Sequence, residues 1–156
     1  MDIQIRRAIP ADAPGLAALI QGLNWFASLE DKTLAQIEAI VERHLAMCLA
    51  DSSHTVYTAT HQVGNILGYT AVHWLPYLFL PGPEGFVSEC FVAEPARGLG
   101  IGNRLLEAVK IEAKQRGCSR LELVNFKQRE SYQREFYAKQ GWEERTLAAN
   151  FVYHLK

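Results

Sequence analysis

Three glycines on alternate positions join an apolar strand to a helical segment of this chain. Gly98, Gly100 and Gly102 follow the apolar run 90–92 and precede a stretch rich in leucine and alanine. Glycines let a backbone approach a ligand closely. The first amides of a helix have no intrahelical partner, so they can point at phosphate oxygens. This order of elements predicts a binding site for a ligand that carries phosphate.

The spacing of this loop disfavours two common kinds of phosphate site. A P-loop ends in Gly-Lys-Ser/Thr, whereas Gly102 is followed by Asn103 and Arg104. A dinucleotide-binding loop needs its last glycine at the position of Asn103. Glu122 lies at the distance expected for an acid that binds ribose, but it is inside a predicted strand and not at its end. A nucleoside triphosphatase and a Rossmann dinucleotide-binding protein are therefore both disfavoured.

Two motifs in the expected order resemble those of the GNAT superfamily of N-acetyltransferases, which bind acetyl-CoA. The pattern Arg97-x-x-Gly100-x-Gly102 after a strand resembles the pyrophosphate-binding motif of that family. Residues 136–142, Phe-Tyr-Ala-Lys-Gln-Gly-Trp, resemble its Phe-Tyr-x-x-x-Gly-Phe signature. The resemblance covers almost the whole chain, and it implies that acetyl-CoA is the cosubstrate.

The resemblance also implies which groups contact acetyl-CoA. In this family the strand before the loop diverges from the strand after the helix, and the pantetheine arm hydrogen-bonds to the exposed backbone of the first strand. Arg97 is expected either to shape the loop or to contact a phosphate. The other expected contacts are the main chain of Cys90, Phe91 and Val92 and the amides of Gly98, Leu99, Gly100, Ile101, Gly102 and Asn103.

The chain departs from the family pattern at one expected cofactor contact. Seven residues before Tyr137, where many members carry an asparagine that contacts the CoA arm, this chain has Glu130. An ionised Glu130 can accept a hydrogen bond from a pantetheine amide but cannot donate one. Asn125, on the preceding predicted strand, is expected to compensate.

Two residues are candidates for proton transfer. Tyr137 occupies the position of the family tyrosine, and a phenol of pKa about 10 can stabilise a departing thiolate through a hydrogen bond that tightens during departure. Glu89 is the candidate base for the acceptor amine, which with a pKa of about 10.4 is mostly protonated near neutral pH. The alternatives are that Tyr137 packs against Phe136 and that Glu89 is a solvated or substrate-pairing carboxylate.

Aromatic residues of two segments are expected to line the acceptor site. Trp25 and Phe26 follow the first predicted helix, and Trp74 and Tyr77 lie where a strand leaves the sheet. In the resembled fold these segments converge over the cleft opposite CoA, where aromatic rings enclose the apolar body of a small substrate or bind its cation. The alternative is that the aromatic residues cover the core or form the interface of a homodimer.

Composition restricts the other partners. The 156 residues have a net charge of -1, which gives no general attraction to nucleic acid or acidic membranes, and no apolar run is long enough for a membrane span. Three widely spaced cysteines are typical of reduced structural thiols in a cytoplasmic protein. The five histidines lack the spacing of metal ligands, so no metal is expected. We expect one domain over residues 1–156.

Apolar periodicity predicts an α/β protein. Helices are expected over about 16–23, 34–49 and 100–116 and in a segment capped by Ser131 that carries Tyr137. A hairpin turn is expected at Gly64–Asn65. The resemblance implies a mixed, mostly antiparallel sheet of about seven strands with splayed central strands, flanked by about four helices. The last two strands are expected near 143–145 and 151–155.

The expected activity is transfer of an acetyl group from acetyl-CoA to a primary amine of a small molecule, by direct attack in a ternary complex. Two alternatives stay open. One is acetylation of a protein lysine or N-terminus, and the other is a non-catalytic module that binds acyl-CoA. The walls of the acceptor site carry no family motif, so the sequence does not identify the amine.

Overall fold

The computed structural model describes residues 2–61 and 65–155, and Gly64 of the expected hairpin turn lies outside these residues. The chain divides after Val124 into two compact units. The first unit contains a sheet and three long helices, and the second contains short helical turns joined by irregular segments. Each unit is described by itself below.

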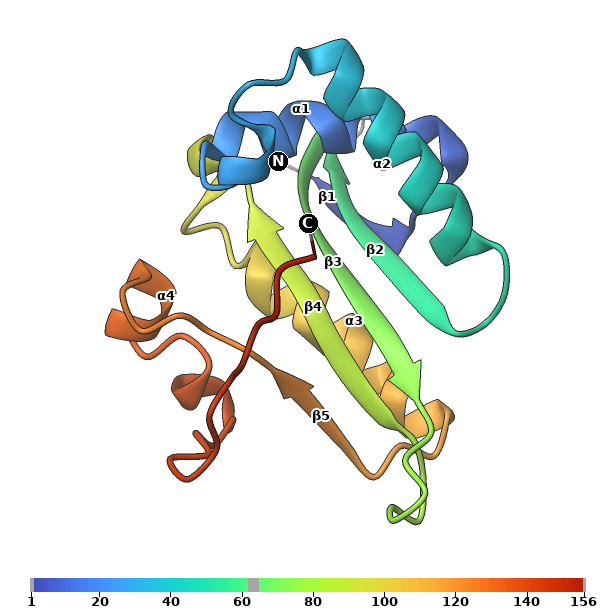
Figure 1. Cartoon of the computed structure of the whole chain (residues 1–156), viewed down its shortest axis with the longest axis vertical. Coiled ribbons are helices and arrows are strands. Elements are labelled where there is room, and N and C mark those ends of the chain that lie inside the picture. Colours follow the sequence, from blue (N-terminus) through green and yellow to red (C-terminus); the bar gives the residue numbers. More distant parts are fainter. Residues whose placement is uncertain (1, 62–64, 156) are drawn as a thin grey trace. The chain divides into compact units, whose positions relative to one another are not determined.

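A mixed sheet forms the centre of the first unit (Figure 1). Its strands lie in the order β1-β2-β3-β4-β5; neighbouring strands are antiparallel as far as β4, and β5 runs parallel to β4. The mixed, mostly antiparallel character of the expected sheet is thus confirmed. The strands are β1 (Ile3–Arg7), β2 (His54–His61), β3 (Ile66–Leu75), β4 (Glu84–Val92) and β5 (Arg120–Leu123).

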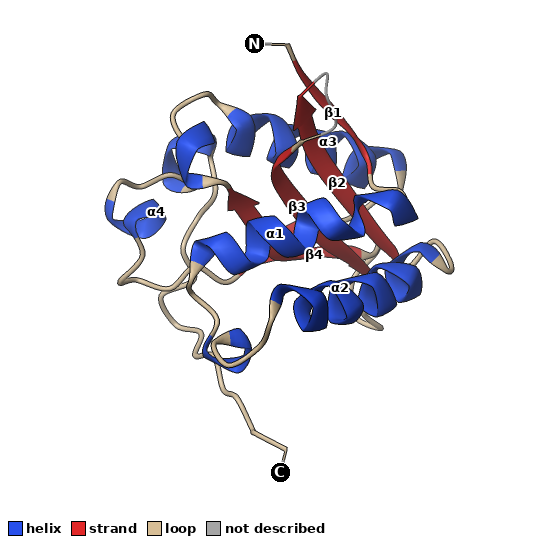
Figure 2. Cartoon of the chain, turned by 90° about the horizontal axis from the view of Figure 1, so that it is seen from above, coloured by secondary structure: helices blue, strands red, loops and turns tan. Residues whose placement is uncertain are grey.

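Helices cover both faces of this sheet. Figure 2 shows α1 and α2 on one face and α3 on the other. Each long helix buries the apolar stripe that its sequence predicts, for example Leu16 and Leu19 of α1 and Leu105 and Val109 of α3. The described helices, four in number as expected, are α1 (Ala13–Leu23), α2 (Leu34–Leu49), α3 (Ile101–Gln115) and α4 (Glu130–Gln133).

The pairing between β4 and β5 covers only the first half of β4. It begins at Glu84 with Arg120 and ends at Val87 with Leu123, where β5 stops. After a bulge at Ser88, opposite Ala71 and Val72, the segment Glu89–Val92 continues to pair with β3 on its other side. Figure 1 shows β5 diverging from β4 beyond their paired ends. The carboxyl half of β4 is therefore a sheet edge within the first unit.

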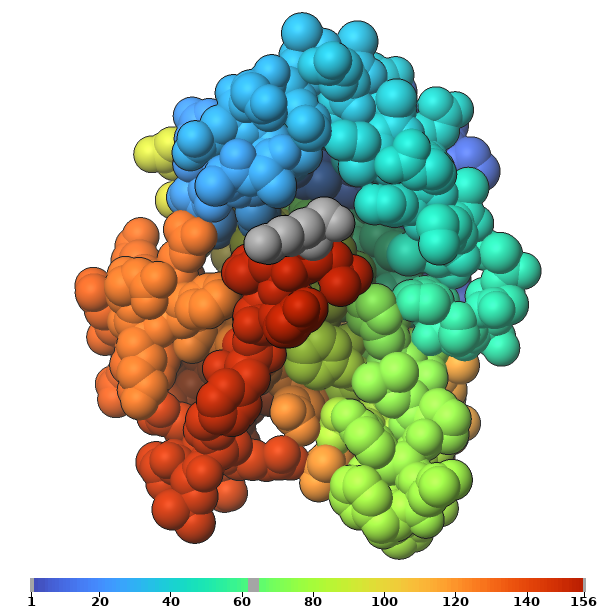
Figure 3. Space-filling model, viewed as in Figure 1, coloured from blue at the N-terminus to red at the C-terminus, as the bar shows by residue number. Residues whose placement is uncertain are grey.

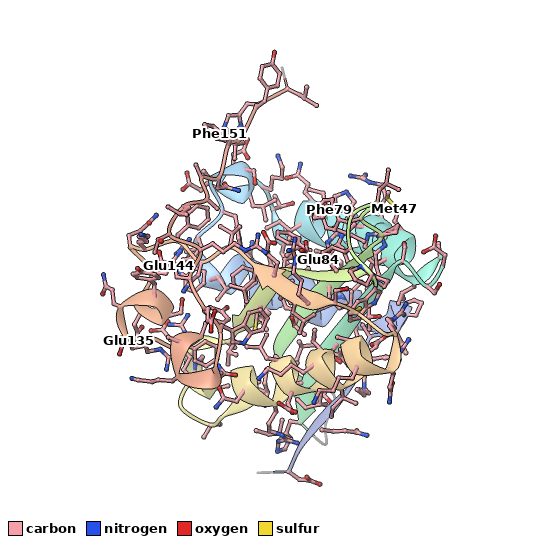
Figure 4. All side chains as sticks on the ribbon, turned by 90° about the horizontal axis from the view of Figure 1, so that it is seen from below. Met47, Phe79, Glu84, Glu135, Glu144 and Phe151 are labelled. Carbon is pink, nitrogen blue, oxygen red and sulfur yellow. The ribbon has the colours of Figure 1, made fainter. Side chains whose placement is uncertain are left out.

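An ion pair joins the two strands where their pairing begins. The guanidinium of Arg120 contacts the carboxylate of Glu84, which is fully buried and labelled in Figure 4. The connection between β3 and β4 carries two strongly exposed side chains, Leu78 and Phe79, and the second is labelled in Figure 4. Figure 3 shows this connection, in light green, at the surface of the first unit.

The expectation of about seven strands is wrong, because the described residues form five. Residues 143–145 and 151–155 have no strand structure. A strand exists only where its backbone groups find partners and its side chains find a surface to cover. Phe151, Tyr153 and Leu155 are 91%, 88% and 90% exposed, so their strand-like alternation buries no apolar face.

The helix expected to carry Tyr137 is also shorter than predicted. α4 ends at Gln133, and Glu135 adopts a left-handed conformation with a φ of 57°. Tyr137 instead immediately precedes a single 3₁₀ turn, Ala138–Gln140. The predicted cap, Ser131, lies inside α4, and its hydroxyl donates to Oδ1 of Asn125 at 3.0 Å. The sequence pattern identified a helical segment but not the residue that interrupts it.

A buried carboxylate links α3 to the face of the sheet that this helix covers. Glu112 accepts hydrogen bonds from Thr55 at 3.0 Å, Tyr57 at 2.6 Å, and Arg7 and Arg116 at 2.9 Å each. Burial raises the pKa of Glu112, but these hydrogen bonds outweigh it, so the pKa lies below its usual range. The ionised form of Glu112 therefore stabilises the folded state.

Replacing Glu112 with glutamine should destabilise the protein in a pH-dependent way. At neutral pH we expect Glu112→Gln to lower the free energy of unfolding by roughly 3 kcal/mol, because the buried side chain loses the charge that Arg7 and Arg116 donate to. Since the folded pKa is depressed, this contribution is present above the unfolded pKa of about 4.3 and is lost as the pH falls below it. Urea unfolding at several pH values measures the difference. A difference that does not shrink in acid would contradict the assignment.

Glu107→Gln is the matched control for this measurement. Glu107 lies on the same helix and forms a 3.7 Å pair with Lys110, but its side chain is largely exposed. Exposed pairs contribute little to stability, so Glu107→Gln should leave the free energy of unfolding almost unchanged.

Candidate active site

The loop before α3 is held in a shape that favours glycine at two positions. Gly98 has a φ of 80°, and Gly100, the N-cap of α3, has a φ of 74°. These left-handed conformations cost glycine little and other residues more. A Cβ at either position would meet no atom within 4 Å, so backbone conformation and not crowding sets the requirement. The exposed segment 97–100 thus leads directly to the first amides of α3.

Two surfaces for main-chain hydrogen bonds therefore follow one another along the chain. The first is the edge formed by Ser88–Val92, and the second is the N-terminal turn of α3. A short 3₁₀ turn, Glu94–Ala96, joins them, and its buried Ala96 packs with Ile101 of α3. An elongated ligand with amides along one part and phosphates at another matches this arrangement chemically.

Glu89 lies on the open half of β4, and its carboxyl is largely enclosed. The hydroxyl of Tyr69 donates to its Oε1 at 3.0 Å. Burial raises the pKa of Glu89, and the hydrogen bond from Tyr69 and the nearby His44 offset this only in part. A carboxyl group with a raised pKa can exchange protons closer to neutral pH than an exposed one.

The neighbouring Cys90 is unsuited to nucleophilic attack. Burial raises the pKa of its thiol to about 12, although a hydrogen bond with Thr70 acts in the opposite direction. The thiolate is the reactive form of cysteine, so Cys90 stays unreactive near neutral pH. Its expected contribution is through the main chain only.

Phe91 is the centre of an aromatic cluster next to Glu89. Its ring contacts Trp25 at 5.7 Å, Phe26 at 5.5 Å and Tyr69 at 5.8 Å between ring centroids, the first two edge to face. The guanidinium carbon of Arg97 lies 5.3 Å from the centroid of Trp25. The structure thus brings together three sequence-predicted groups: the aromatic pair after α1, the open half of β4, and the residue before the glycine loop.

A pocket of about 460 Å³ lies beside this cluster. It is formed by the last turns of α1, the connection between α1 and α2, and the first turn of α2. Aromatic and polar groups share its wall, among them Gln21, Trp25, Phe26, Glu30 and Lys32.

Trp74 and Tyr77 do not join this cluster, which corrects the expectation that the two aromatic segments converge. The strand register pairs Trp74 with Gly85 and Tyr69 with Phe91, so Trp74 lies five residues from Tyr69, roughly 17 Å along β3. Trp74 is buried and points to the α3 face, where Arg116 lies over its ring at 4.7 Å. Tyr77 stacks against Phe79 in the connection before β4.

The second unit contains the other predicted residues. The half-buried ring of Tyr137 lies 5.0 Å from Phe136 and 6.1 Å from Trp142, edge to face in both cases. Asn125 accepts the hydrogen bond from Ser131 described above, and Glu130 is exposed in the first turn of α4. The motif residues 136–142 therefore form a local aromatic cluster around the candidate acid.

Sequence reasoning missed the polar partner of Glu89, because the hydroxyl of Tyr69 contacts its carboxyl. His73 contacts the hydroxyl of the preceding residue, Ser88, at 2.8 Å. Burial lowers the pKa of His73, with a smaller contribution from His54. These contacts join residues 20 and 15 positions apart, and only the register of β3 against β4 could have revealed them.

In the described part of the chain, no three or more His, Cys, Asp or Glu side chains come close enough together to hold a metal ion. None of the helices in residues 2–61 and 65–155 combines the length and apolarity needed to cross a membrane.

Comparisons with solved structures place the fold among acetyltransferases. A transcriptional regulator from Bacillus halodurans C-125 is 22% identical, with a TM-score of 0.83 and coverage of 99% of this chain and 100% of its own. A ribosomal-protein-alanine N-acetyltransferase from Brucella melitensis biovar Abortus 2308 is 22% identical, with a TM-score of 0.72 and coverage of 98% of this chain and 100% of its own. An aminoglycoside acetyltransferase from an uncultured soil metagenomic sample is 19% identical, with a TM-score of 0.78 and coverage of 99% of this chain and 97% of its own.

These identities establish the similarity of fold alone. The sequence matches none of the curated proteins. It does match the acetyltransferase (GNAT) family over residues 20–142, a range that includes both the glycine loop and the motif at Tyr137. This match extends over most of the chain, and the α/β sheet with its four helices is the fold of that family. The chain therefore belongs to the GNAT family of acetyltransferases.

Proposed function

We propose that this protein transfers an acetyl group from acetyl-CoA to a primary amine of a small molecule, by direct attack in a ternary complex. The observation that carries the proposal is the position of Glu89. Its enclosed carboxyl lies on the open half of β4, directly before the residues expected to contact CoA. The proposal treats residues 1–156 as one domain.

Acetyl-CoA is the proposed donor because the family generally uses it and the main-chain surfaces suit it. The pantetheine arm would add to the edge of β4 at Cys90, Phe91 and Val92, as a peptide adds to a sheet edge. The pyrophosphate would accept hydrogen bonds from amides of the segment 98–103, where the helix dipole of α3 favours negative charge. Arg97 directly precedes the same loop and would add positive charge near the phosphates.

The proposed transfer moves three protons. Glu89 takes one from the ammonium form of the acceptor, and the neutral nitrogen then attacks the thioester carbonyl. As the carbon–sulfur bond breaks, Tyr137 gives its proton to the departing thiolate, and the attacking nitrogen loses its second proton to solvent to become the amide. Solvent then returns a proton to Tyr137. The raised pKa of Glu89 suits the first movement, because a base works best when its pKa lies near the working pH.

A small acceptor is supported by the surroundings of Glu89. Trp25 and Phe26 contact Phe91 and also line the pocket at the end of α1. Aromatic walls with a few polar groups are typical of sites for small molecules. Acetylation of a protein lysine or N-terminus, and acyl-CoA binding without turnover, are the alternatives.

One assay separates these alternatives. Release of free CoA from acetyl-CoA is followed in the presence of amino acids, polyamines, aminoglycosides and lysine-containing peptides. Turnover with a free amine supports the proposal. Turnover with peptides alone would favour a protein acetyltransferase, and acetyl-CoA binding with no turnover on any amine would favour a binding module.

The glycine loop can be tested with a matched pair of glycines, one before α3 and one after it. Gly100→Asp places a carboxylate where phosphates are expected, so calorimetry should show at least a tenfold loss of acetyl-CoA affinity. Gly117→Asp is the control, because Gly117 also has a positive φ, 69°, and open space around a Cβ, but follows the other end of α3. Equal affinities of the two folded variants would place the phosphates elsewhere.

The acid is tested by removing one hydroxyl. Tyr137→Phe should lower kcat by roughly 100-fold with little change in the affinity for acetyl-CoA, because the lost interaction belongs to the transition state. Tyr132→Phe is the control in the same unit, since Tyr132 donates to Glu144 at 3.0 Å and has no proposed role in transfer. If kcat of Tyr137→Phe equals that of Tyr132→Phe, Tyr137 is a packing residue.

The base is tested by its pH dependence. Glu89→Gln should lower kcat by roughly 100-fold near neutral pH, and raising the pH should restore part of the rate because more of the amine is then already neutral. Steady-state kinetics between pH 6 and pH 9.5 measures this. A loss that is uniform with pH and confined to KM for the amine would instead identify Glu89 as a binding carboxylate.

A further inference from the structure

A hydrogen bond joins Tyr69 to Glu89, and neither residue belongs to the two sequence motifs at 97–102 and 136–142. Tyr69 is 4% exposed, and its ring is fixed against Phe91. Its hydroxyl reaches diagonally across the sheet, because Tyr69 pairs with Phe91 and Ala71 pairs with Glu89. A buried phenol in a rigid sheet can hold a carboxyl group in one orientation.

The groups around this carboxyl come from two further elements. His44 and Cys48 of α2 both interact electrostatically with Glu89, in addition to Tyr69 of β3. His44 is exposed, whereas Cys48 is half-buried, and burial raises the pKa of the Cys48 thiol. Among these groups Tyr69 is the one that donates a hydrogen bond to the carboxyl. Burial and Glu89 itself raise the pKa of Tyr69 well above its usual value, so Tyr69 stays protonated and remains a donor.

We infer that Tyr69 is a positioning residue for the acetyl transfer: it holds Oε1 of Glu89, so that Oε2 takes the proton of the acceptor amine. The inference rests on the proposed function of Glu89. Two consequences follow from the geometry. The hydrogen bond fixes the rotation of the carboxyl group, and it favours the ionised form of Glu89 that is needed to accept a proton.

Tyr69→Phe tests the inference, because it keeps the ring that packs on Phe91 and removes the hydroxyl alone. Without the hydrogen bond, the carboxylate form of Glu89 is less stable, so the acidic limb of the kcat profile should move to higher pH by about one unit. On the acidic side of the limb kcat should fall about tenfold, and at high pH it should approach the unmodified rate. The affinity for acetyl-CoA should not change.

Tyr57→Phe is a matched control in the same sheet. Tyr57 donates to the buried Glu112 at 2.6 Å, but its hydroxyl lies on the α3 face and has no role in the proposed transfer. The control should lose stability while its kcat profile stays in place. A limb that moves equally in both variants, or in neither, overturns the inference.

A double variant distinguishes failure of this inference from failure of the proposed base. In Glu89→Gln, the further change Tyr69→Phe should alter kcat less than twofold, because Tyr69 acts through Glu89. Full activity of Glu89→Gln alone would overturn the proposed base. A large loss in Glu89→Gln together with an unmoved profile in Tyr69→Phe would overturn only the role of Tyr69.

A second substitution keeps the test valid if Tyr69→Phe does not fold. Placing 3-fluorotyrosine at position 69 retains the hydroxyl and makes it more acidic, hence a stronger donor. The acidic limb should then move to lower pH, opposite to the effect of phenylalanine. No movement, or movement to higher pH, contradicts the inference.

Discussion

The structure depends on one interruption of hydrogen bonding, at the point where β5 ends and β4 continues. Four residue pairs hold the two strands together, from Glu84 with Arg120 to Val87 with Leu123. Beyond them the backbone of Glu89–Val92 pairs with β3 alone. A sheet edge of this kind is a template for a further extended chain. The glycine loop follows directly, so the same ligand can meet the edge and then the first amides of α3.

Two carboxylates, the buried Glu112 and the half-buried Glu89, lie on opposite faces of the sheet and show how the surroundings decide what such a group does. Both accept a hydrogen bond from a tyrosine. Glu112 also accepts hydrogen bonds from two arginines, so its pKa is lowered and its charge stabilises the packing of α3. Among the described residues no arginine takes part at Glu89, and the hydrogen bond from Tyr69 together with the nearby His44 does not offset burial, so the pKa of Glu89 is raised. The first arrangement suits a structural ion pair and the second suits proton exchange.

The sequence predicts the local features well and the long-range ones poorly. Glycine spacing identified the loop and apolar periodicity identified the long helices, since both depend on neighbouring residues. The contact of Tyr69 with Glu89 and the separation of Trp74 from Trp25 depend on strand register and on which face a residue occupies. The two missing C-terminal strands and the helix break at Glu135 have the same origin, because alternation or helical spacing cannot show whether a segment finds a partner.

The central claim is that the open half of β4 and the first turn of α3 bind one acetyl-CoA molecule together. Hydrogen–deuterium exchange of the full chain, with and without acetyl-CoA, tests it most directly. The account predicts slower exchange in two separate segments at once, within residues 88–92 and within 98–103, with the same dependence on ligand concentration. Protection of the glycine loop with no change in 88–92 would contradict the claim, because the edge of β4 would then have no part in binding.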